Sequence, residues 1–208
     1  MSLLIALSGC AEANVSEVPL PPVKPTSLGA VASTAGGLCG DPRLKGERIG
    51  RLTGKIAACG VQDAIRLTHV SGIALRAPAR VNCDTARTFA DWLTGPANAS
   101  ARRSLGSPIR NVRVVASYAC RSRNNRPGAR LSEHAFGRAI DVGGVTLANG
   151  REISVLENWG KGSAGAWLRE IWRAACGPFK TVLGPDGDRF HKDHFHFDVA
   201  QRRSTFCR

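Results

Sequence analysis

The stretch Arg189–Val199 reads Arg-Phe-His-Lys-Asp-His-Phe-His-Phe-Asp-Val and holds three of the five histidines of this 208-residue chain, together with two carboxylates. Read as a strand with a period of two, it places His194, His196 and Asp198 on one face. The opposite face carries apolar side chains, namely Phe195, Phe197 and Val199. We therefore predict a strand with one face in the core and the other able to hold a metal ion.

A second histidine segment supplies the rest of the predicted metal site. Two histidines alternating on a strand give half of a tetrahedral zinc site, and a catalytic zinc site uses three protein ligands plus an open position. The other histidines are His69 and His134, and His134 lies seven residues before Asp141. The His134-x6-Asp141 spacing indicates the missing ligands. We expect His69 to be an ordinary packed or solvated side chain.

These two segments resemble the signature motifs of the LAS zinc metallopeptidases, which include lysostaphin-type enzymes, D-alanyl-D-alanine carboxypeptidases and the signalling domain of hedgehog. The matching motifs are Ser132-x-His134-x2-Gly137-x-Ala139-x-Asp141 and His194-x-His196. Most of residues 39–208 also resembles the bacterial extensin-like C-terminal family, through Tyr118-Ala-Cys-Arg-Ser122, Ser132-Glu-His134 and Phe206-Cys-Arg208. The resemblance implies an α+β fold, with a small antiparallel sheet and flanking helices that carry a zinc site, braced by disulfides.

The resemblance also implies roles for individual residues. It implies that zinc is held by His134, Asp141 and His196. The general base stays open between two patterns. Asp-x-x-His, as in carboxypeptidase-type members, points to Asp193, which we slightly favour. His-x2-His-x-His, as in penicillin-insensitive murein endopeptidases, points to His194.

Other residues of the same segments have supporting roles in this hypothesis. His191 or Arg121 is expected to stabilise the oxyanion, because a cation near the reacting carbonyl offsets its developing charge. Asp198, on the metal-facing side of the predicted strand, is expected either to orient a histidine ligand or to be a solvated charge at the end of the strand.

The implied function is a zinc-dependent peptidase that hydrolyses an amide bond in peptidoglycan stem peptides or cross-links. An endopeptidase is favoured over a carboxypeptidase. The alternative is a non-catalytic, zinc-containing envelope protein that binds its partners on the same fold, as hedgehog's signalling domain does.

Cysteine usage and the N-terminus favour the bacterial cell envelope, and the periplasm in particular. Seven cysteines without a C-x2-C pair indicate disulfides in an oxidising compartment. Residues 1–10 are interpreted as a partial signal sequence, where Leu7-Ser-Gly-Cys10 resembles a lipobox with Cys10 as the lipidated residue. Residues 11–38 are predicted to be a Pro/Gly-rich flexible tether. Residues 39–208 then form the catalytic domain, with six cysteines left for three disulfides.

The charge indicates an anionic partner. The formal net charge is +13, with 23 arginines among 29 basic residues. The densest cluster, Arg121–Arg130, contains no aromatic residue for base stacking, so we predict no nucleic-acid partner. Peptidoglycan peptides carry free carboxylates, which guanidinium groups bind well. The protein is expected to be a monomer that meets a membrane only through a lipid anchor at Cys10.

Local patterns predict the elements around these motifs. A helix is expected to begin at Asn82-Cys-Asp84 and to end at Gly95-Pro96, and another spans 164–176 after a Ser163 cap. Strands are expected at 111–118 and 137–142, with a sharp turn at Gly143-Gly144 that leaves Asp141 at a strand end. Segments 181–183 and 195–199 are predicted to pair as antiparallel strands, with Cys176 and Cys207 able to join nearby.

Overall fold

Residues 36–208 are described by a computed structural model. The predicted leader with its lipobox cysteine Cys10, and the predicted tether up to residue 35, lie outside the described residues. None of the helices within residues 36–208 is both long and apolar enough to cross a membrane.

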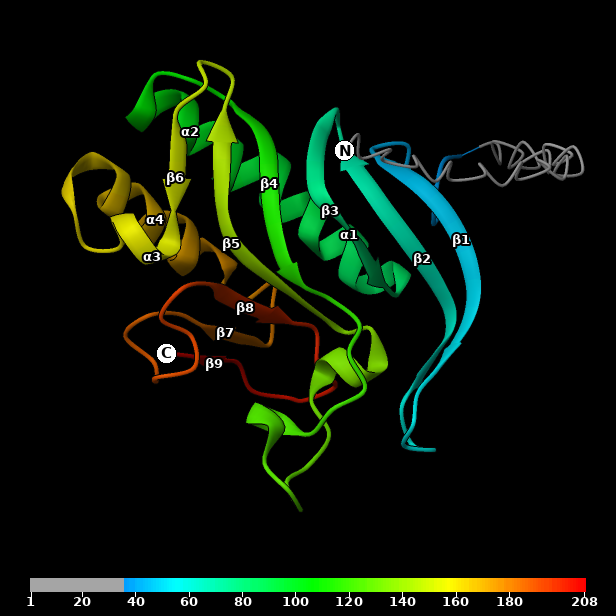
Figure 1. The fold of residues 1–208 in the computed structure, drawn as a ribbon. Coiled ribbons are helices and arrows are strands. Elements are labelled where there is room, and N and C mark those ends of the chain that lie inside the picture. The colour runs from blue at the N-terminus through cyan, green and yellow to red at the C-terminus, as the bar shows by residue number, and fades with distance from the viewer. Residues whose placement is uncertain (1–35) are drawn as a thin grey trace, which may run out of the picture. The chain divides into compact units, whose positions relative to one another are not determined.

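One sheet runs through the described part of the chain (Figure 1). Its order is β1-β2-β3-β4-β5-β8-β7-β9, and β6 pairs with β5. The strands are β1 (Leu44–Thr53), β2 (Gly60–Val70), β3 (Ile73–Val81), β4 (Ile109–Ala116), β5 (Ala139–Leu147), β6 (Glu152–Ser154), β7 (Thr181–Leu183), β8 (Phe195–Asp198) and β9 (Phe206–Cys207). The α+β class is confirmed. The sheet is larger than the small antiparallel one that we expected, and it is mixed, because β3–β4 and β7–β9 are parallel pairs.

Helices cover one face of this sheet, and in Figure 1 α1, α2 and α4 lie behind it. The helical elements are α1 (Cys83–Trp92), the π-helix η1 (Leu93–Ala97), α2 (Asn98–Leu105), α3 (Val155–Asn158), α4 (Gly162–Ala175), and the 3-10 turns η2 (Arg123–Asn125) and η3 (Glu133–Phe136). Trp92 of α1 packs edge-on against Phe197 of β8, with ring centroids 5.0 Å apart. The apolar face of β8 therefore faces the core, as its sequence predicts.

Two helices have ends close to the predicted ones. The start of α1 is confirmed, because the Asn82 side chain accepts a hydrogen bond of 2.9 Å from the Thr85 backbone N–H. A non-helical ψ at Gly95 (φ −82°, ψ −106°) breaks the helical backbone where Gly95-Pro96 predicts the end, and a second helical stretch follows the kink through η1 into α2. A proline can follow a kink and open the next helical turn, where its missing N–H is not needed. Helix α4 begins one residue before Ser163, after Lys161, and has no side-chain cap.

The predicted turn at Gly143-Gly144 is wrong. Strand β5 continues through both glycines to Leu147, with a register shift against β4 at Gly143, so Asp141 is the third residue of a nine-residue strand. A Cβ on Gly144 would lie 2.3 Å from the Ile153 carbonyl oxygen of the neighbouring β6. Gly144 thus allows close approach to the β6 backbone, and Gly143 leaves room for the Arg113 and Val115 side chains of β4.

Three disulfides join distant parts of the described chain, as the cysteine count predicts. Cys39 pairs with Cys83, Cys59 with Cys120, and Cys176 with Cys207. The Cys176–Cys207 disulfide connects the end of α4 to β9, as the sequence analysis expected of these two cysteines. The second places the β1–β2 connection beside the residue that precedes Arg121.

Candidate metal centre

Three side chains from three segments converge where strands β5 and β8 pair; Figure 1 shows these two strands side by side. His134 lies in the turn η3, which is capped by Ser132: the Ser132 hydroxyl accepts a 3.4 Å hydrogen bond from the His134 backbone N–H. The turn ends at Gly137, whose φ of 62° suits glycine. Strands β5 and β8 then pair Asp141 directly with His196. Strand register and a short turn together bring the predicted ligands to one point.

The three predicted ligands form a compact, buried donor set. His134 Nε2 lies 3.2 Å from Asp141 Oδ2 and 3.2 Å from His196 Nδ1. His196 Nδ1 lies 2.9 Å from Asp141 Oδ1. One donor atom of each residue lies within 4.8 Å of the others, so a single metal ion can be held by all three. Two imidazole nitrogens and one carboxylate oxygen are a ligand set that fits Zn²⁺.

In His134 and His196, the ring nitrogen that points away from Asp141 has a hydrogen-bond partner of its own, which fixes the orientation of each ring. His134 Nδ1 lies 2.5 Å from the Ser117 carbonyl oxygen, to which it can donate. His196 Nε2 lies 3.3 Å from Asp198 Oδ2. This leaves His134 Nε2 and His196 Nδ1 turned toward Asp141. Second partners of this kind orient ligating histidines in metal sites, and Asp198 is where the sequence predicts such a partner.

The charges of the metal-free site are strongly coupled. Burial works against the protonated form of His196, but hydrogen bonds to Asp141 and Asp198 raise its pKa to about 9. Burial also works against the ionised form of Asp141, but hydrogen bonds from His134 and His196 hold its pKa well below the usual range. The site therefore keeps a carboxylate and takes up a proton, which a divalent cation can replace.

His194 approaches the donor set from one side. Its Nε2 lies 3.6 Å from Asp141 Oδ2, and its Nδ1 lies 2.7 Å from Asp193 Oδ1. The hydrogen bond from His194 lowers the pKa of Asp193, whose side chain is 64% exposed. One imidazole thus links an exposed carboxylate to the buried ligands.

His191 packs beside these histidines. Its ring centroid lies 5.2 Å from that of His194 and 5.8 Å from that of His196, and its Nδ1 lies 2.8 Å from Asp188 Oδ1. Burial is the main cause of the lowered pKa of His191, although Asp188 opposes it. A lowered pKa favours the neutral ring, whose Nδ1–H donates to Asp188, so Nε2 is left as a hydrogen-bond acceptor.

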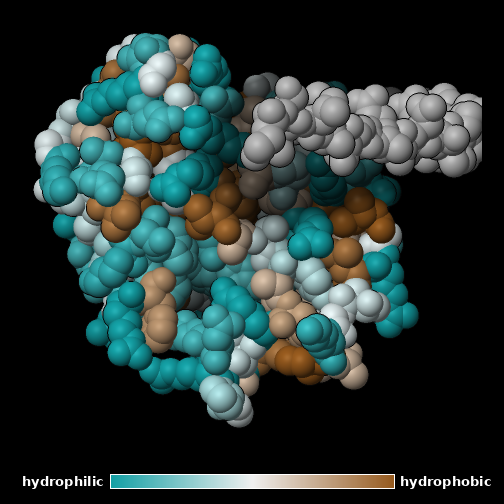
Figure 2. All heavy atoms as spheres, viewed as in Figure 1, coloured by the Kyte–Doolittle hydropathy of each residue, from teal (hydrophilic) through white to brown (hydrophobic). Residues whose placement is uncertain are grey.

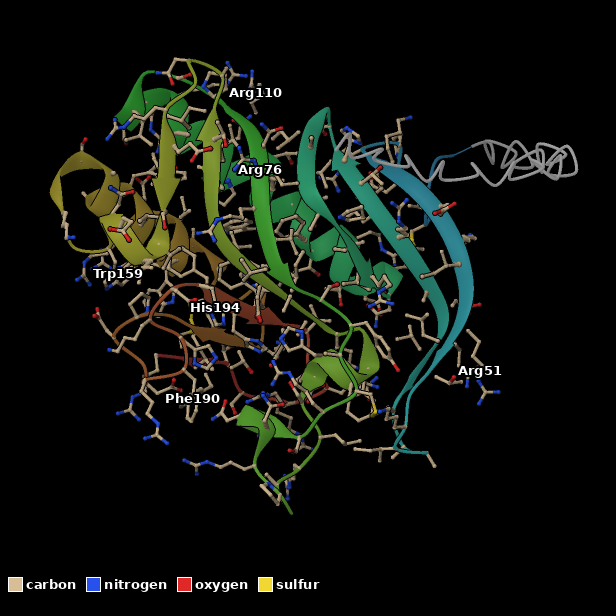
Figure 3. All side chains as sticks on the ribbon, in the orientation of Figure 1. Arg51, Arg76, Arg110, Trp159, Phe190 and His194 are labelled. Carbon is tan, nitrogen blue, oxygen red and sulfur yellow. A yellow bond between two sulfur atoms is a disulfide. The ribbon has the colours of Figure 1, made fainter. Side chains whose placement is uncertain are left out.

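The histidines and aspartates of this site line a cavity of about 620 Å³. Figure 3 shows His194 and Phe190, which both line it, on the same side of the molecule, while Arg110 lies at the far end of the sheet. Among residues 36–208 the lining consists of Val115, Ala116, Arg121, Arg123, Asn124, Asn125, Ser132, Glu133, His134, Asp141, Thr181, Leu183, Asp188, Phe190, His191, Asp193, His194, His196, Asp198, Arg202 and Phe206. Hydrophilic residues dominate the face seen in Figure 2.

A protein-family comparison now bears on this arrangement. The model described as "Extensin-like protein C-terminus" matches residues 46–208, which includes every residue of the cavity. The chain belongs to this family. A comparison with curated proteins found no match, and a comparison with solved structures found none either.

The structure brings every predicted site residue of the extensin-like chain to the cavity. Arg121 lines it from the loop after β4, where the Cys59–Cys120 disulfide and a 3.0 Å hydrogen bond from Ser132 N to Arg121 O hold the backbone. His69 lies elsewhere, exposed on β2, with its Nδ1 3.1 Å from Thr68 Oγ1. The expectation that His69 is an ordinary side chain fits this position.

Sequence reasoning missed several lining residues of the extensin-like chain. Asp188 had a usable signal, because it precedes His191 by three residues in the same loop. Glu133 stands beside a ligand in the motif and contacts Arg138 at 3.6 Å. Arg202 had no signal, since it lies in a loop after β8 without a motif of its own.

Proposed function

We propose that the protein is a zinc-dependent peptidase that hydrolyses an amide bond in peptidoglycan stem peptides or cross-links, with an endopeptidase favoured over a carboxypeptidase. The observation that carries the proposal is the convergence of His134, Asp141 and His196 inside a cavity large enough for a peptide segment. The resemblance of both histidine motifs to LAS metallopeptidases supplies the reaction class and the substrate.

Each ligand residue is prepared for a cation. His134 and His196 would hold zinc through Nε2 and Nδ1, since their other nitrogens face Ser117 O and Asp198. Asp141 would supply the carboxylate ligand. Zinc bound there would act as a Lewis acid, polarising the scissile carbonyl and lowering the pKa of water toward about 7.

His194 is the better placed of the two candidate bases. Its Nε2 is directed to the ligand side, 3.6 Å from Asp141 Oδ2, whereas Asp193 contacts its opposite nitrogen. In this proposal His194 Nε2 accepts a proton from the attacking water and returns it to the leaving amine. Asp193 accepts the Nδ1–H of that ring, fixes its tautomer and stabilises the imidazolium that forms.

The remaining cavity residues would bind and orient the peptide. The Arg121 guanidinium can attract carboxylates of the substrate and donate to the developing oxyanion. The neutral His191 ring gives its Nδ1–H to Asp188, so its Nε2 can only accept a hydrogen bond, for example from a peptide N–H. Three disulfides support a proposed location in the periplasm or elsewhere in the bacterial envelope.

The test combines metal analysis with digestion of muropeptides. Oxidised protein should contain one zinc per chain, and the chelator-treated protein should be inactive until zinc is restored. His134→Ala should lose both zinc and activity, whereas His194→Ala should keep zinc and lose most activity. His69→Ala serves as the matched control, with zinc and activity unchanged. Stoichiometric zinc with no peptide cleaved by the wild type would refute the peptidase and leave a zinc-containing binding protein.

A further inference from the structure

Arg202 lies in the cavity wall, in the loop that follows β8, and nothing in the peptidase proposal uses it. Its Nη2 contacts Thr181 Oγ1 and lies 3.6 Å from Asp198 Oδ2, while its backbone N–H donates to Ala200 O at 2.9 Å. The side chain is 31% exposed. The guanidinium is therefore held in place without being buried.

We propose that Arg202 and Phe206 form a carboxylate-binding subsite, which takes an anionic group carried on an aliphatic part of a peptide. This inference rests on the proposed function, because it concerns the ligand of the same cavity. It differs from the predicted role of Arg121, which comes from the loop after β4.

The β7–β9 pairing brings the two members of the subsite together. Thr181, whose hydroxyl contacts Arg202, is the register partner of Phe206 in the parallel pair. The Cys176–Cys207 disulfide anchors the residue next to Phe206. Phe206 lines the cavity and is 48% exposed, so one side of its ring is open to a ligand in the cavity.

Arg202 has spare capacity for an anion. Within residues 36–208 its side-chain hydrogen bond and ion pair both use Nη2, so donors on Nε and Nη1 can face a ligand. Asp198, the carboxylate beside it, is also bound to His196 Nε2 and the Ala200 backbone N–H. Because Asp198 is shared with the metal-facing histidine, it offsets only part of the Arg202 charge.

The chemistry of the wall defines the ligand class. A guanidinium binds a carboxylate through parallel hydrogen bonds, and the neighbouring Phe206 ring with Leu183 offers apolar surface to the carbon chain that carries it. A stem-peptide residue with a free carboxylate on a short aliphatic chain has both features. Amidation of that carboxylate would remove the charge while keeping the shape.

The experiment is a double-mutant-type cycle in which Arg202 and the charge of the ligand are removed separately and together, and the binding affinity is measured each time. Isolated stem peptides, and the same peptides amidated with ammonia by carbodiimide coupling, are titrated calorimetrically into zinc-loaded His194→Ala protein, so that no peptide is consumed. The same titrations are done with Arg202→Gln added, and with Arg110→Gln added as control. Arg110 is exposed at the far end of β4 and is outside the cavity lining (Figure 3).

We expect amidation to weaken binding about tenfold or more when Arg202 is present, as for loss of a charge-assisted hydrogen bond. In the Arg202→Gln background, acidic peptides should bind about as weakly as amidated ones do to the parent, and amidation should have a clearly smaller further effect. Arg110→Gln should leave the discrimination intact. Equal effects of amidation with and without Arg202, or no binding of acidic peptides to the parent, would overturn the subsite.

Two further readouts separate the subsite from a purely structural role of Arg202 and from the peptidase proposal. The zinc affinity of Arg202→Gln should stay within about twofold of the parent. A large loss of zinc without any coupling to ligand charge would assign Arg202 to holding Asp198 instead. Hydrolysis by protein with His194 intact distinguishes the peptidase proposal from the subsite proposal. Binding that depends on ligand charge, without any cleavage, would refute the peptidase alone. Cleavage that is unchanged by amidation of the peptide would refute the subsite alone.

Discussion

Zinc affinity should depend on pH through one buried histidine. In the metal-free protein His196 Nδ1 faces Asp141 at 2.9 Å and Nε2 faces Asp198 at 3.3 Å, which raises the pKa of His196 to about 9. Zinc needs the lone pair of Nδ1, so below that pH each binding event must release a proton. The apparent association constant should rise about tenfold per pH unit between pH 7 and 8.5 and level off above about 9.

The size of the effect follows from the same pKa. At pH 7 the site lies about two units below it, so proton competition weakens zinc binding about 100-fold, or about 2.7 kcal/mol, relative to the fully deprotonated site. Asp141 contributes no slope in this range, because its pKa is held far lower by hydrogen bonds that outweigh its burial.

The assay is a competition titration against a chromophoric zinc chelator, corrected for the protonation of the chelator itself. His69→Ala is the control and should show the same slope, since His69 is exposed on β2. A flat profile from pH 7 to 8.5 would mean that His196 is already neutral, and the hydrogen-bond argument would be wrong.

Four other outcomes follow from the described contacts. Without zinc, the raised pKa of His196 contributes stability that is fully present below pH 6.5 and is lost as the pH rises toward about 9. The free energy of unfolding from urea titration should therefore fall by up to about 3 kcal/mol over this range, and an unchanged value would contradict the raised pKa. Asp198→Asn should lower zinc affinity about 10- to 100-fold in the chelator competition, because Asp198 orients His196; unaltered affinity would exclude that role. Replacing both Cys176 and Cys207 by serine should lower the free energy of unfolding in denaturant by about 2–4 kcal/mol, since the disulfide joins residues 31 positions apart in the sequence. Phe197→Ala should cost about 3–5 kcal/mol in the same experiment, because the ring is fully buried between Trp92 and Phe179; a loss under 1 kcal/mol would contradict the observed packing.

The candidate site could be predicted from sequence because its chemistry is concentrated in two short segments. Alternation from Phe195 to Asp198 gives the two faces of β8, and the Ser132–Asp141 motif gives the other ligands. Asp198 was found by the same alternation. The fold class followed from the resemblance, and the helix beginning after Asn82 followed from its cap.

Other features depend on contacts that the local sequence does not encode. Strand β1 lies at the sheet edge and exposes most of its residues, so no hydrophobic alternation marks it. The glycines of β5 favour a turn when read locally, and their reason lies in the neighbouring strands: Gly144 faces the β6 backbone, and Gly143 faces side chains of β4. The position of Arg202 is set by Thr181, which is 21 residues away in the chain.

Pairing of Asp141 with His196 links metal binding to the assembly of the hydrophobic interior. Because side chains alternate along β8, a shift of one residue against β5 would turn Phe195 and Phe197 outward and carry His196 into the apolar layer. Misaligned chains would thus lose the cation site and the interior together. Zinc uptake by refolded protein would consequently report the fraction of molecules whose strands are correctly aligned.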